Sequence, residues 1–377
     1  MSKAGIYIHI PFCVQKCGYC DFYSVTDMGL KPSFTAALVK EIQLRSRPQA
    51  ICDTLYMGGG TPSLLDQHDI SKILETIGQH FLISEDAEVT LEANPATISF
   101  NKLTDLHHMG LNRINIGVQS FSDRHLKLLG RIHTAKDAHE SIIMARKAGF
   151  KRLGVDLIYG LPEQTENMWQ KDLKATLSYF PEHISCYMLT YENKTLMDKQ
   201  RQRGAIIPLD EAKVADLFEF TDEFLCQNGY DHYEISNFAR KNPDSDYRSR
   251  HNRKYWNGAP YFGFGPAAHS FESPLRAWNL RDVTAYIKNL SQNRLPVAET
   301  ETLSFSQQRL EAIYLGLRQS DGIDLAAFEK KFKERLPAAD LALLQRLQKE
   351  KMVVYDNTTL ALTVKGMRYI DSIVPLI

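Results

Sequence analysis

Short apolar runs alternate with longer amphipathic stretches through the first two hundred residues of this 377-residue chain. The short runs are rich in β-branched residues, which is typical of buried strands, and the longer stretches have helical spacing. The predicted strands cover residues 5–10, 54–57, 88–93, 113–118, 153–159 and 183–189. The predicted helices cover residues 33–45, 70–80, 99–109, 135–148, 167–179 and 210–228.

This repeated strand–helix order predicts a parallel sheet with right-handed crossovers. Six units, the last completed by the helix at 210–228, are too few to close an ordinary eight-stranded barrel. We therefore expect an α/β fold built on a partial (β/α)6 TIM-type barrel over residues 1–230.

Two further segments follow the predicted barrel. Residues 230–278 hold eleven aromatic side chains, so we expect an aromatic-rich extension over 231–300. Residues 301–377 predict helices at 307–318, 325–335 and 339–349, then a hairpin with strands 352–355 and 361–364 around the turn at 357–358. Three helices followed by a hairpin predict a small C-terminal domain that is winged-helix-like.

Composition narrows the class of protein. Forty-five basic and forty-five acidic residues cancel, and residues 301–377 hold eleven basic and ten acidic side chains, so neither the chain nor its last domain predicts nucleic-acid binding. No apolar run is long enough to span a membrane, and the first residues lack the features of a signal peptide. Six cysteines are too sparse for a disulfide framework, which favours the reducing cytoplasm.

Three of the cysteines are closely spaced, because Cys13, Cys17 and Cys20 form a CxxxCxxC string. Three soft thiolates suit an iron–sulfur cluster, and they leave one iron open to the amino and carboxylate groups of S-adenosylmethionine. Structural zinc is the alternative, but it wants four protein ligands. His9 is a conceivable fourth ligand. The other cysteines are isolated and are expected in the core: Cys52, Cys186 and Cys226.

Polar or glycine-rich strings follow several predicted strands, where ligands bind in parallel α/β folds. They are residues 58–62 (GGGTP), 92–95, 117–120 and 156–162. Each alone has a plain structural explanation, since a glycine turn or a buried carboxylate is common. Together with the cysteine loop they predict one site at the carboxyl edge of the sheet.

The cysteine loop, the GGGTP turn and the YIHIPFC lead-in resemble the radical S-adenosylmethionine superfamily, and within it the coproporphyrinogen-oxidase-like branch. The similarity extends through residues 130–133 and 155–162 and into the C-terminal domain. It implies a [4Fe-4S] cluster on the three cysteines and an adenine pocket completed by residues 187–190. It also implies S-adenosylmethionine contacts from a set of residues matched by motif: Tyr7, Gly59, Gly60, Thr61, Glu92, Gln119, Arg131 and Asp156.

Within that branch, oxygen-independent coproporphyrinogen dehydrogenases have a further cysteine where this chain has Phe22. The chain is more similar to the haem chaperones of the HemW type, which share Cys-Asp-Phe and a second string, HNxxYW. That resemblance implies haem contacts from His251, Asn252, Tyr255 and Trp256, with His251 as the axial ligand. His269 is a second candidate ligand. Six basic residues and two aspartates in 240–254 could face the haem propionates, or form a solvated loop.

The expected function is that of a cytoplasmic haem chaperone that transfers haem to acceptor haemoproteins, with respiratory proteins as the expected partners. The cluster and S-adenosylmethionine would then organise the protein rather than drive turnover. The alternative is a radical SAM oxidoreductase acting on a tetrapyrrole, an oxygen-independent coproporphyrinogen III dehydrogenase. The acceptor, covalent haem attachment, a homodimer and a peripheral contact with membrane complexes all stay open at this point.

Overall fold

The computed structural model describes residues 3–336, 341–356 and 358–377, and the chain divides into two compact units. Unit 1 holds the described residues of Met1–Leu209 together with Ala259–Thr302. Unit 2 holds the described residues of Asp210–Gly258 and Leu303–Ile377. The segment expected over 231–300 is therefore shared between the two units, and the predicted boundary at 230 falls inside unit 2.

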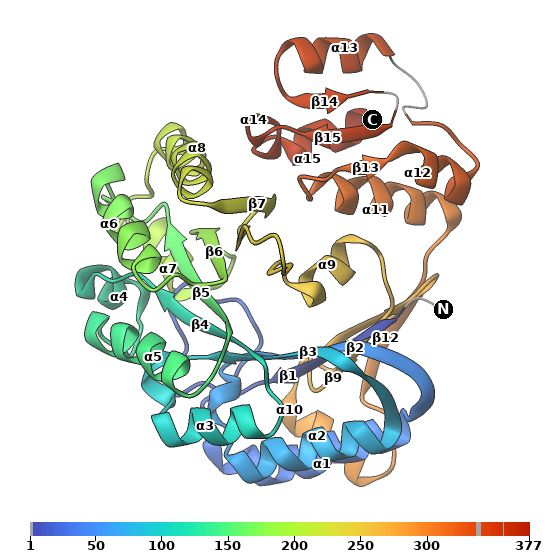
Figure 1. The fold of residues 1–377 in the computed structure, drawn as a ribbon. Helices are drawn as coiled ribbons and strands as arrows, with labels where there is room; N and C mark the ends of the chain where they lie inside the picture. Colours follow the sequence, from blue (N-terminus) through green and yellow to red (C-terminus); the bar gives the residue numbers. More distant parts are fainter. Residues whose placement is uncertain (1–2, 337–340, 357) are drawn as a thin grey trace. The chain divides into compact units, whose positions relative to one another are not determined.

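Unit 1 is built on a curved sheet whose strand order is β12-β11-β10-β9-β1-β2-β3-β4-β5-β6 (Figure 1). Strands β1 to β6 run parallel in chain order, which confirms the partial barrel, and β9 adds in parallel beside β1. The bounds are β1 (Ala4–Ile10), β2 (Arg47–Gly59), β3 (Phe81–Ala93), β4 (Arg113–Gln119), β5 (Arg152–Tyr159), β6 (His183–Met188), β9 (Tyr261–Phe264), β10 (His269–Glu272), β11 (Leu275–Asn279) and β12 (Val297–Thr302).

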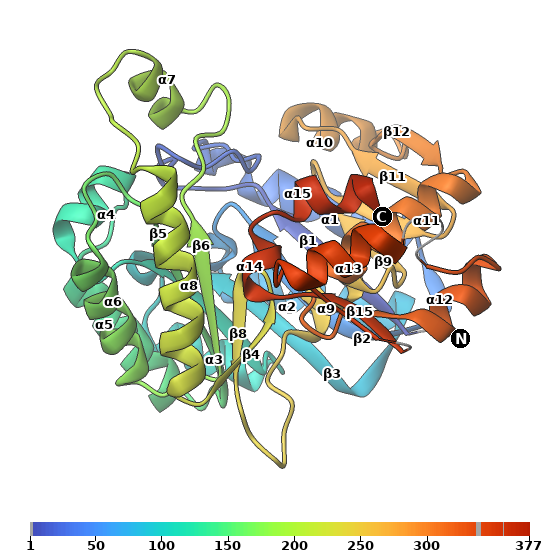
Figure 2. The same ribbon diagram turned by 90° about the horizontal axis from the view of Figure 1, so that it is seen from above.

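Helices cover the convex face of this sheet (Figures 1 and 2). Side-chain caps fix where several of these helices begin. The side chains of Ser99, Thr134 and Thr165 each accept a hydrogen bond from a backbone N–H in the first turn of the helix that follows. The bounds are α1 (Lys31–Leu44), α2 (Gln67–His80), α3 (Phe100–His108), α4 (Asp123–Leu129), α5 (Ala135–Lys147), α6 (Glu166–Leu177), α7 (Leu196–Gln202) and α10 (Val283–Ser291), with 3-10 turns η1 (Met28–Leu30), η2 (Pro62–Leu64) and η3 (Pro95–Thr97).

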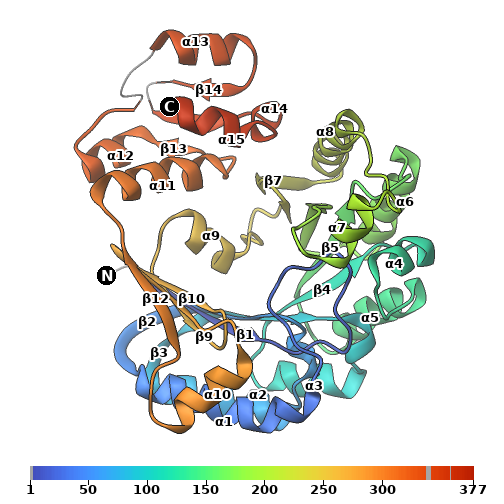
Figure 3. The ribbon, with the colours of Figure 1, turned by 180° about the vertical axis from the view of Figure 1, so that it is seen from behind.

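Residues 259–302 of unit 1 extend the sheet along the edge of β1 that does not pair with β2. Strands β9 to β12 continue the sheet there, and α10 packs beside α1 below them (Figure 3). Glu41 of α1 is fully buried at this junction, where it accepts hydrogen bonds from Gly265 N, the Asn279 amide and the Tyr286 hydroxyl. A buried carboxylate needs such partners, so this cluster fixes the added strands to the barrel.

Unit 2 contains α8 (Glu211–Gln227), a β-hairpin, α9 (Arg250–Trp256) and the C-terminal domain. The predicted helix at 210–228 is α8, and it belongs to unit 2 rather than to the barrel unit. The remaining bounds are β7 (Tyr230–Glu234), β8 (Asn237–Arg240), α11 (Phe305–Leu317), β13 (Ile323–Asp324), α12 (Leu325–Phe332), α13 (Leu341–Lys349), β14 (Val353–Tyr355), β15 (Thr359–Leu362), α14 (Val364–Met367), α15 (Ile370–Ile373) and η4 (Val374–Leu376).

The C-terminal domain has the predicted order of three helices followed by a hairpin, and β13 joins that hairpin to give the sheet order β13-β15-β14. Its core includes Leu317, Phe328 and Leu360, and Phe218 and Ile235 pack against the same core from α8 and the segment after β7. The predicted helix start at 339–340 and the predicted turn residue 357 lie outside the described residues.

Candidate functional site

The cysteine loop follows β1 and is held at both ends by backbone hydrogen bonds. Cys13 N donates to Val25 O at 3.0 Å, which closes the loop on itself. Gly18 N donates to Leu129 O of α4 at 3.2 Å, and Met197 N of α7 donates to Gly18 O at 2.9 Å. These two short helices were missed from the sequence, and they fix the middle of the loop.

The three thiols of the loop lie close enough together to influence one another. Burial, with smaller contributions from the neighbouring Cys17 and Cys13, raises the pKa of Cys20 to about 11. The Thr61 hydroxyl donates to Cys13 Sγ at 3.5 Å, and Arg131 Nη1 donates to Cys17 Sγ at 3.6 Å. A thiolate cluster would gain from both donors, because they stabilise negative charge on sulfur.

A site for a single metal ion is a poorer description of this loop. Within the part of the chain that the structure describes, no three His, Cys, Asp or Glu side chains are grouped to hold one ion. Both ring nitrogens of His9 are already engaged, with Nε2 2.8 Å from Tyr23 O and Nδ1 3.2 Å from Tyr7 Oη. Burial also lowers the pKa of His9 to about 4. His9 therefore acts as a structural residue, and three soft thiolates suit a multi-iron cluster better.

The GGGTP turn lies directly against the cysteine loop. Gly60 N donates to Ile10 O at 2.8 Å, and a β-carbon on Gly60 would lie 2.7 Å from Phe12 O. Gly59 has φ +110°, and a β-carbon there would lie 2.7 Å from the His9 ring. Only glycine fits both positions, so the turn presents bare backbone beside the thiols.

Glu92, at the end of β3, lies next to this turn. Its carboxylate accepts from the Tyr56 hydroxyl at 2.8 Å and from Gly59 N at 3.2 Å. Burial, together with the charge of Asp156, raises the pKa of Glu92 to about 7, although both hydrogen bonds oppose the shift. A buried carboxyl group whose pKa lies near neutral pH is suited to bind an incoming ammonium group.

Arg131 and Asp156 each keep one buried polar atom without a partner, Arg131 Nε and Asp156 Oδ1. Arg131 donates through Nη2 to Gly117 O at 2.7 Å, which leaves the guanidinium facing the thiols. Burial raises the pKa of Asp156 to about 6, against a hydrogen bond from Ser185. Unpartnered buried groups of opposite charge fit a ligand that carries both a carboxylate and hydroxyl donors.

Gln119 ends β4 with φ +66°, a left-handed conformation that is uncommon outside glycine. Its amide nitrogen would lie 2.9 Å from a β-carbon on Gly117, so the two positions are packed against each other. Tyr7, on β1, stacks on Tyr56 with ring centroids 6.2 Å apart. At the end of β6, Tyr187 is largely exposed, which is compatible with the predicted adenine pocket but does not define one.

Several residues that hydrogen-bond to the predicted site residues were not predicted from the sequence. Tyr56 and Ser185 hold the two acidic groups, Asn115 donates to Tyr56 Oη at 3.2 Å, and Tyr19 hydrogen-bonds Arg131. The alternation along β4 gives a usable signal for Asn115, since it lies four residues before the predicted site residue Gln119.

The predicted haem residues lie together on α9, in unit 2. His251 is buried, and its Nε2 lies 2.8 Å from Tyr255 Oη in an edge-on ring contact. The Arg318 guanidinium covers Trp256 at 4.7 Å, and Asn252 N is capped by Ser249 Oγ. Iron ligation through Nε2 of His251 would therefore require its hydrogen bond to Tyr255 to be exchanged.

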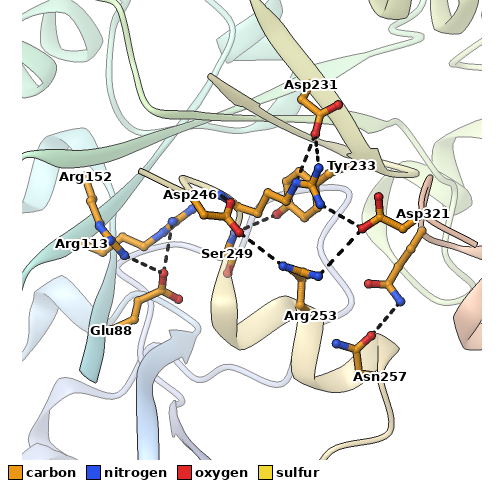
Figure 4. Close-up of polar contacts among 12 residues, drawn as sticks. Glu88, Arg113, Arg152, Asp231, Tyr233, Asp246, Ser249, Arg253, Asn257 and Asp321 are labelled. Carbon is orange, nitrogen blue, oxygen red and sulfur yellow. Dashed lines mark hydrogen bonds and ion pairs between the residues drawn. The ribbon is translucent and has the colours of Figure 1, made fainter. Parts of the chain in front are cut away.

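Ion pairs fix α9 within unit 2. Arg248 donates to Asp231 at 2.6 Å and to Asp321 at 2.9 Å, and Figure 4 shows Arg253 between Asp246 and Asp321. Arg248 and Arg253, both within the basic stretch 240–254, are thus engaged by carboxylates. They are positioned to hold the helix rather than to meet propionates.

His269 lies on β10 in unit 1 and is exposed. Its ring stacks on Trp278 with centroids 5.6 Å apart. In unit 1, Arg113 Nη1 and Arg152 Nη1 lie 3.4 Å and 3.7 Å from Glu88 Oε2. Figure 4 draws these ion pairs. This buried charge group belongs to the barrel core.

Comparison with known proteins identifies two family regions. Residues 7–175 match the radical SAM superfamily, and residues 303–369 match the HemN C-terminal domain. Among solved structures, the coproporphyrinogen III oxidase HemN from Escherichia coli matches with a TM-score of 0.86 at 25% identity, covering 99% of this chain and 89% of that one.

No helix in the described part of the chain is long and apolar enough to cross a bilayer.

Several relatives match nearly end to end. Heme chaperone HemW of Lactococcus lactis is 34% identical over 362 residues, which cover 96% of this chain and 93% of that protein. HemW of Bacillus subtilis is 33% identical, covering 96% and 95%. The mitochondrial radical S-adenosyl methionine domain-containing protein 1 of Danio rerio is 34% identical, covering 100% and 87%.

Proposed function

The chain belongs to the HemW family of haem chaperones within the radical SAM superfamily, and from this we propose that it binds haem and transfers it to acceptor haemoproteins. The acceptors we propose are respiratory haemoproteins, and the compartment is the cytoplasm. The observation that carries the proposal is Asp21-Phe22 directly after the third loop cysteine, in a chain that matches HemW proteins over 96% of its length.

We further propose that Cys13, Cys17 and Cys20 hold a [4Fe-4S] cluster beside an S-adenosylmethionine site. When bound, that cluster can supply one electron to S-adenosylmethionine. The residues of the chain would bind and orient this cofactor: Arg131 would pair with the methionyl carboxylate, and Glu92 with the ammonium group. The unpartnered oxygen of Asp156 would accept a hydrogen bond from a ribose hydroxyl. The two buried polar atoms without a partner, Arg131 Nε and Asp156 Oδ1, support this assignment.

For haem, we propose axial ligation by His251 after its hydrogen bond to Tyr255 is released. The neighbouring Trp256 and Tyr255 offer flat apolar area to the macrocycle, and Asn252 lies on the same helix. The Ser249 cap and the ion pairs of Arg248 keep α9 in place while the imidazole changes partner. Since His269 is exposed beside Trp278, it is the alternative ligand.

One anaerobic preparation tests the function. Reconstituted protein is titrated with haem while the Soret band is followed, and it is then assayed with coproporphyrinogen III and S-adenosylmethionine. We expect stable haem binding and no decarboxylated product. Product formation without stable haem binding would replace the chaperone by the alternative, an oxygen-independent coproporphyrinogen III dehydrogenase.

Matched variants test the ligands. His251→Ala should abolish the Soret change and leave iron and sulfide content intact, whereas His269→Ala should leave both intact. The reverse result would move the axial ligand to His269. Cys17→Ala should lose the cluster and Cys226→Ala should keep it, because Cys226 lies on α8 and outside the loop.

A further inference from the structure

Two buried hydrogen-bond donors without a partner lie on neighbouring side chains of unit 2. They are Trp256 Nε1 and Arg318 Nε. Trp256 is the last residue of α9, Arg318 caps the carboxyl end of α11, and the Arg318 guanidinium carbon lies 4.7 Å from the centroid of the indole ring. Since buried polar groups of folded proteins nearly always have a partner, this pair of donors points to an acceptor that binds there.

The backbone around both donors is fixed by contacts that do not use them. Gln319, the residue after Arg318, donates through Nε2 to Asn257 Oδ1 at 2.9 Å. Asn257 in turn directly follows Trp256, so this bond joins the two chain segments next to the donors. Ile235 N also donates to the carbonyl oxygen of Arg318 at 3.2 Å. The two side chains are therefore held beside each other before any ligand binds.

Arg318 differs from other arginines of unit 2 in lacking a carboxylate partner. Arg248 pairs with Asp231 at 2.6 Å, and Arg309 pairs with Glu334 at 2.8 Å. Among the residues that the structure describes, Arg318 forms no such pair. An arginine keeps its charge in proteins, and a partly buried charge without a counter-ion is costly. The missing partner of Arg318 is thus expected to be an anion.

The polar side chains nearest to Arg318 have other partners. Glu234 accepts a hydrogen bond from the Asn237 amide, and its pKa is raised by burial although Arg318 lowers it. The ring of Tyr314 lies 5.8 Å from the Arg318 guanidinium carbon, and its hydroxyl donates to Asp371 at 2.7 Å. Neither side chain therefore fills the acceptor position at Arg318 Nε.

We propose that Trp256 and Arg318 bind a propionate carboxylate of the haem that His251 ligates, an inference that rests on the proposed function. A carboxylate offers two acceptor oxygens, one for the guanidinium and one for the indole N–H, and its charge would neutralise Arg318. The axial ligand binds at the centre of the macrocycle, whereas the propionates extend from its edge. Trp256 lies five residues beyond His251, about 7.5 Å further along α9, so it can reach that edge.

The same contact would prepare the indole ring for the macrocycle. In the free protein the guanidinium of Arg318 covers the ring face of Trp256. Both side chains are half-buried, so the Arg318 side chain can turn toward a carboxylate at the indole edge while its backbone stays in place. That rotation would expose the flat face of Trp256 to the porphyrin. Only hydrogen bonds and an ion pair change in this step.

The test compares haem with haem dimethyl ester, in which both propionates are esterified and carry no charge. The full chain with its cluster reconstituted is titrated anaerobically with each compound while the Soret band is followed. The variants are Arg318→Gln, which removes the charge, and Trp256→Phe, which keeps a flat ring and removes the N–H donor. Arg309→Gln is the matched control, because nine residues place Arg309 on the opposite face of α11, where it pairs with Glu334.

We expect the wild type and Arg309→Gln to bind haem at least about tenfold more tightly than the ester. Arg318→Gln should lose about tenfold in haem affinity with its ester affinity unchanged, and Trp256→Phe should show a smaller loss of the same kind. The Soret position should stay constant, because His251 still ligates the iron.

Three results would overturn the propionate site. They are equal wild-type affinities for haem and the ester, a loss for both compounds in Arg318→Gln, which would indicate a merely structural role, and full discrimination retained in that variant. Failure of the function proposed above would look different, as a wild type whose Soret band responds to neither compound.

Discussion

Gly60 lies where the GGGTP turn meets the cysteine loop, and it has no room for a side chain. A β-carbon there would meet Phe12 O at 2.7 Å and Ile10 O at 2.9 Å. Both neighbours are backbone atoms, so neither can swing aside without moving the loop. The geometry of the thiols and the geometry of the turn are therefore fixed by the same contact.

We expect Gly60→Ala to displace the loop, lower the free energy of unfolding by about 1–3 kcal/mol and reduce iron and sulfide incorporation. Gly78→Ala on α2 is the control, because its β-carbon would meet nothing within 4 Å. Replacing a helical glycine with alanine should raise the free energy of unfolding by up to about 1 kcal/mol. Denaturant unfolding and cluster content measure both variants, and full cluster content in Gly60→Ala would contradict the coupling.

Glu92 gives the site a pH dependence. Because its pKa is raised to about 7, the carboxyl is largely neutral at pH 6 and largely ionised at pH 8. Only the ionised form attracts an ammonium, so the affinity for S-adenosylmethionine should rise roughly tenfold over that range. Calorimetric titration at several pH values measures it.

Glu92→Gln should flatten this pH profile, and Glu75→Gln, an exposed change on α2, should leave it unchanged. If Glu92→Gln kept the full pH dependence, the titrating group would be a different one. Asp156, whose pKa is raised to about 6, would then be the next to examine.

At the scale of elements, α9 is a short helix whose position depends on residues far away in the sequence. Arg248, just before it, pairs with Asp231 of β7 and with Asp321 after α11. Gln319 Nε2 donates to Asn257 Oδ1 at 2.9 Å, just past the other end of α9. Seven residues alone make a marginal helix, so these contacts hold it.

Arg248→Ala should lower the free energy of unfolding by about 1 kcal/mol, since its carboxylate partners are partly exposed. We also expect faster amide hydrogen exchange across α9 and weaker haem binding. Arg346→Ala removes an exposed pair of 3.9 Å and should change none of these. Unchanged exchange in Arg248→Ala would mean that the ion pairs do not support the helix.

Element prediction from the sequence succeeded where the pattern was local. Apolar runs located β1, β4, β5 and β6, and glycine strings located the turn beside the cysteines. The amino halves of β2 and β3 were missed because exposed polar residues interrupt their apolar positions, as at Gln49 in β2 and at Glu85 and Asp86 in β3. The short helices α4 and α7 give too few turns for a periodic signal.

For the site, too, local patterns were predictive and tertiary contacts were not. Strand order puts the cysteine loop, Glu92 and Asp156 at one edge of the sheet, and the family resemblance adds Arg131 to them. The burial of His251 and the pairing of Arg248 with Asp321 could not be predicted. Both depend on tertiary contacts between segments about 70 residues apart.

At the scale of the molecule, the haem motif and the C-terminal domain share unit 2, while the cysteine loop belongs to unit 1. The core of the C-terminal domain also takes in Phe218 of α8 and Ile235. Weakening that core should therefore affect haem binding before it affects the cluster.

Leu317→Ala, at a fully buried position of α11, should cost about 2–5 kcal/mol and lower the temperature at which haem binding is lost. Leu310→Ala, on the same helix at 52% exposure, should change stability by less than about 0.5 kcal/mol. Soret and cluster absorbance followed during heating separate the two losses. Simultaneous loss of both signals in Leu317→Ala would show that the units unfold together.

Strand β1 has its two neighbours at very different distances along the chain. It pairs with β2 on one side and with β9, about 250 residues later, on the other. At ribosomal rates of about 5–20 residues per second, β1 waits roughly 10–50 s with one edge unpaired. Such an edge is prone to pair with other chains. The strand that leads into the cysteine loop therefore gains its second neighbour only after residues 261–264 have been translated.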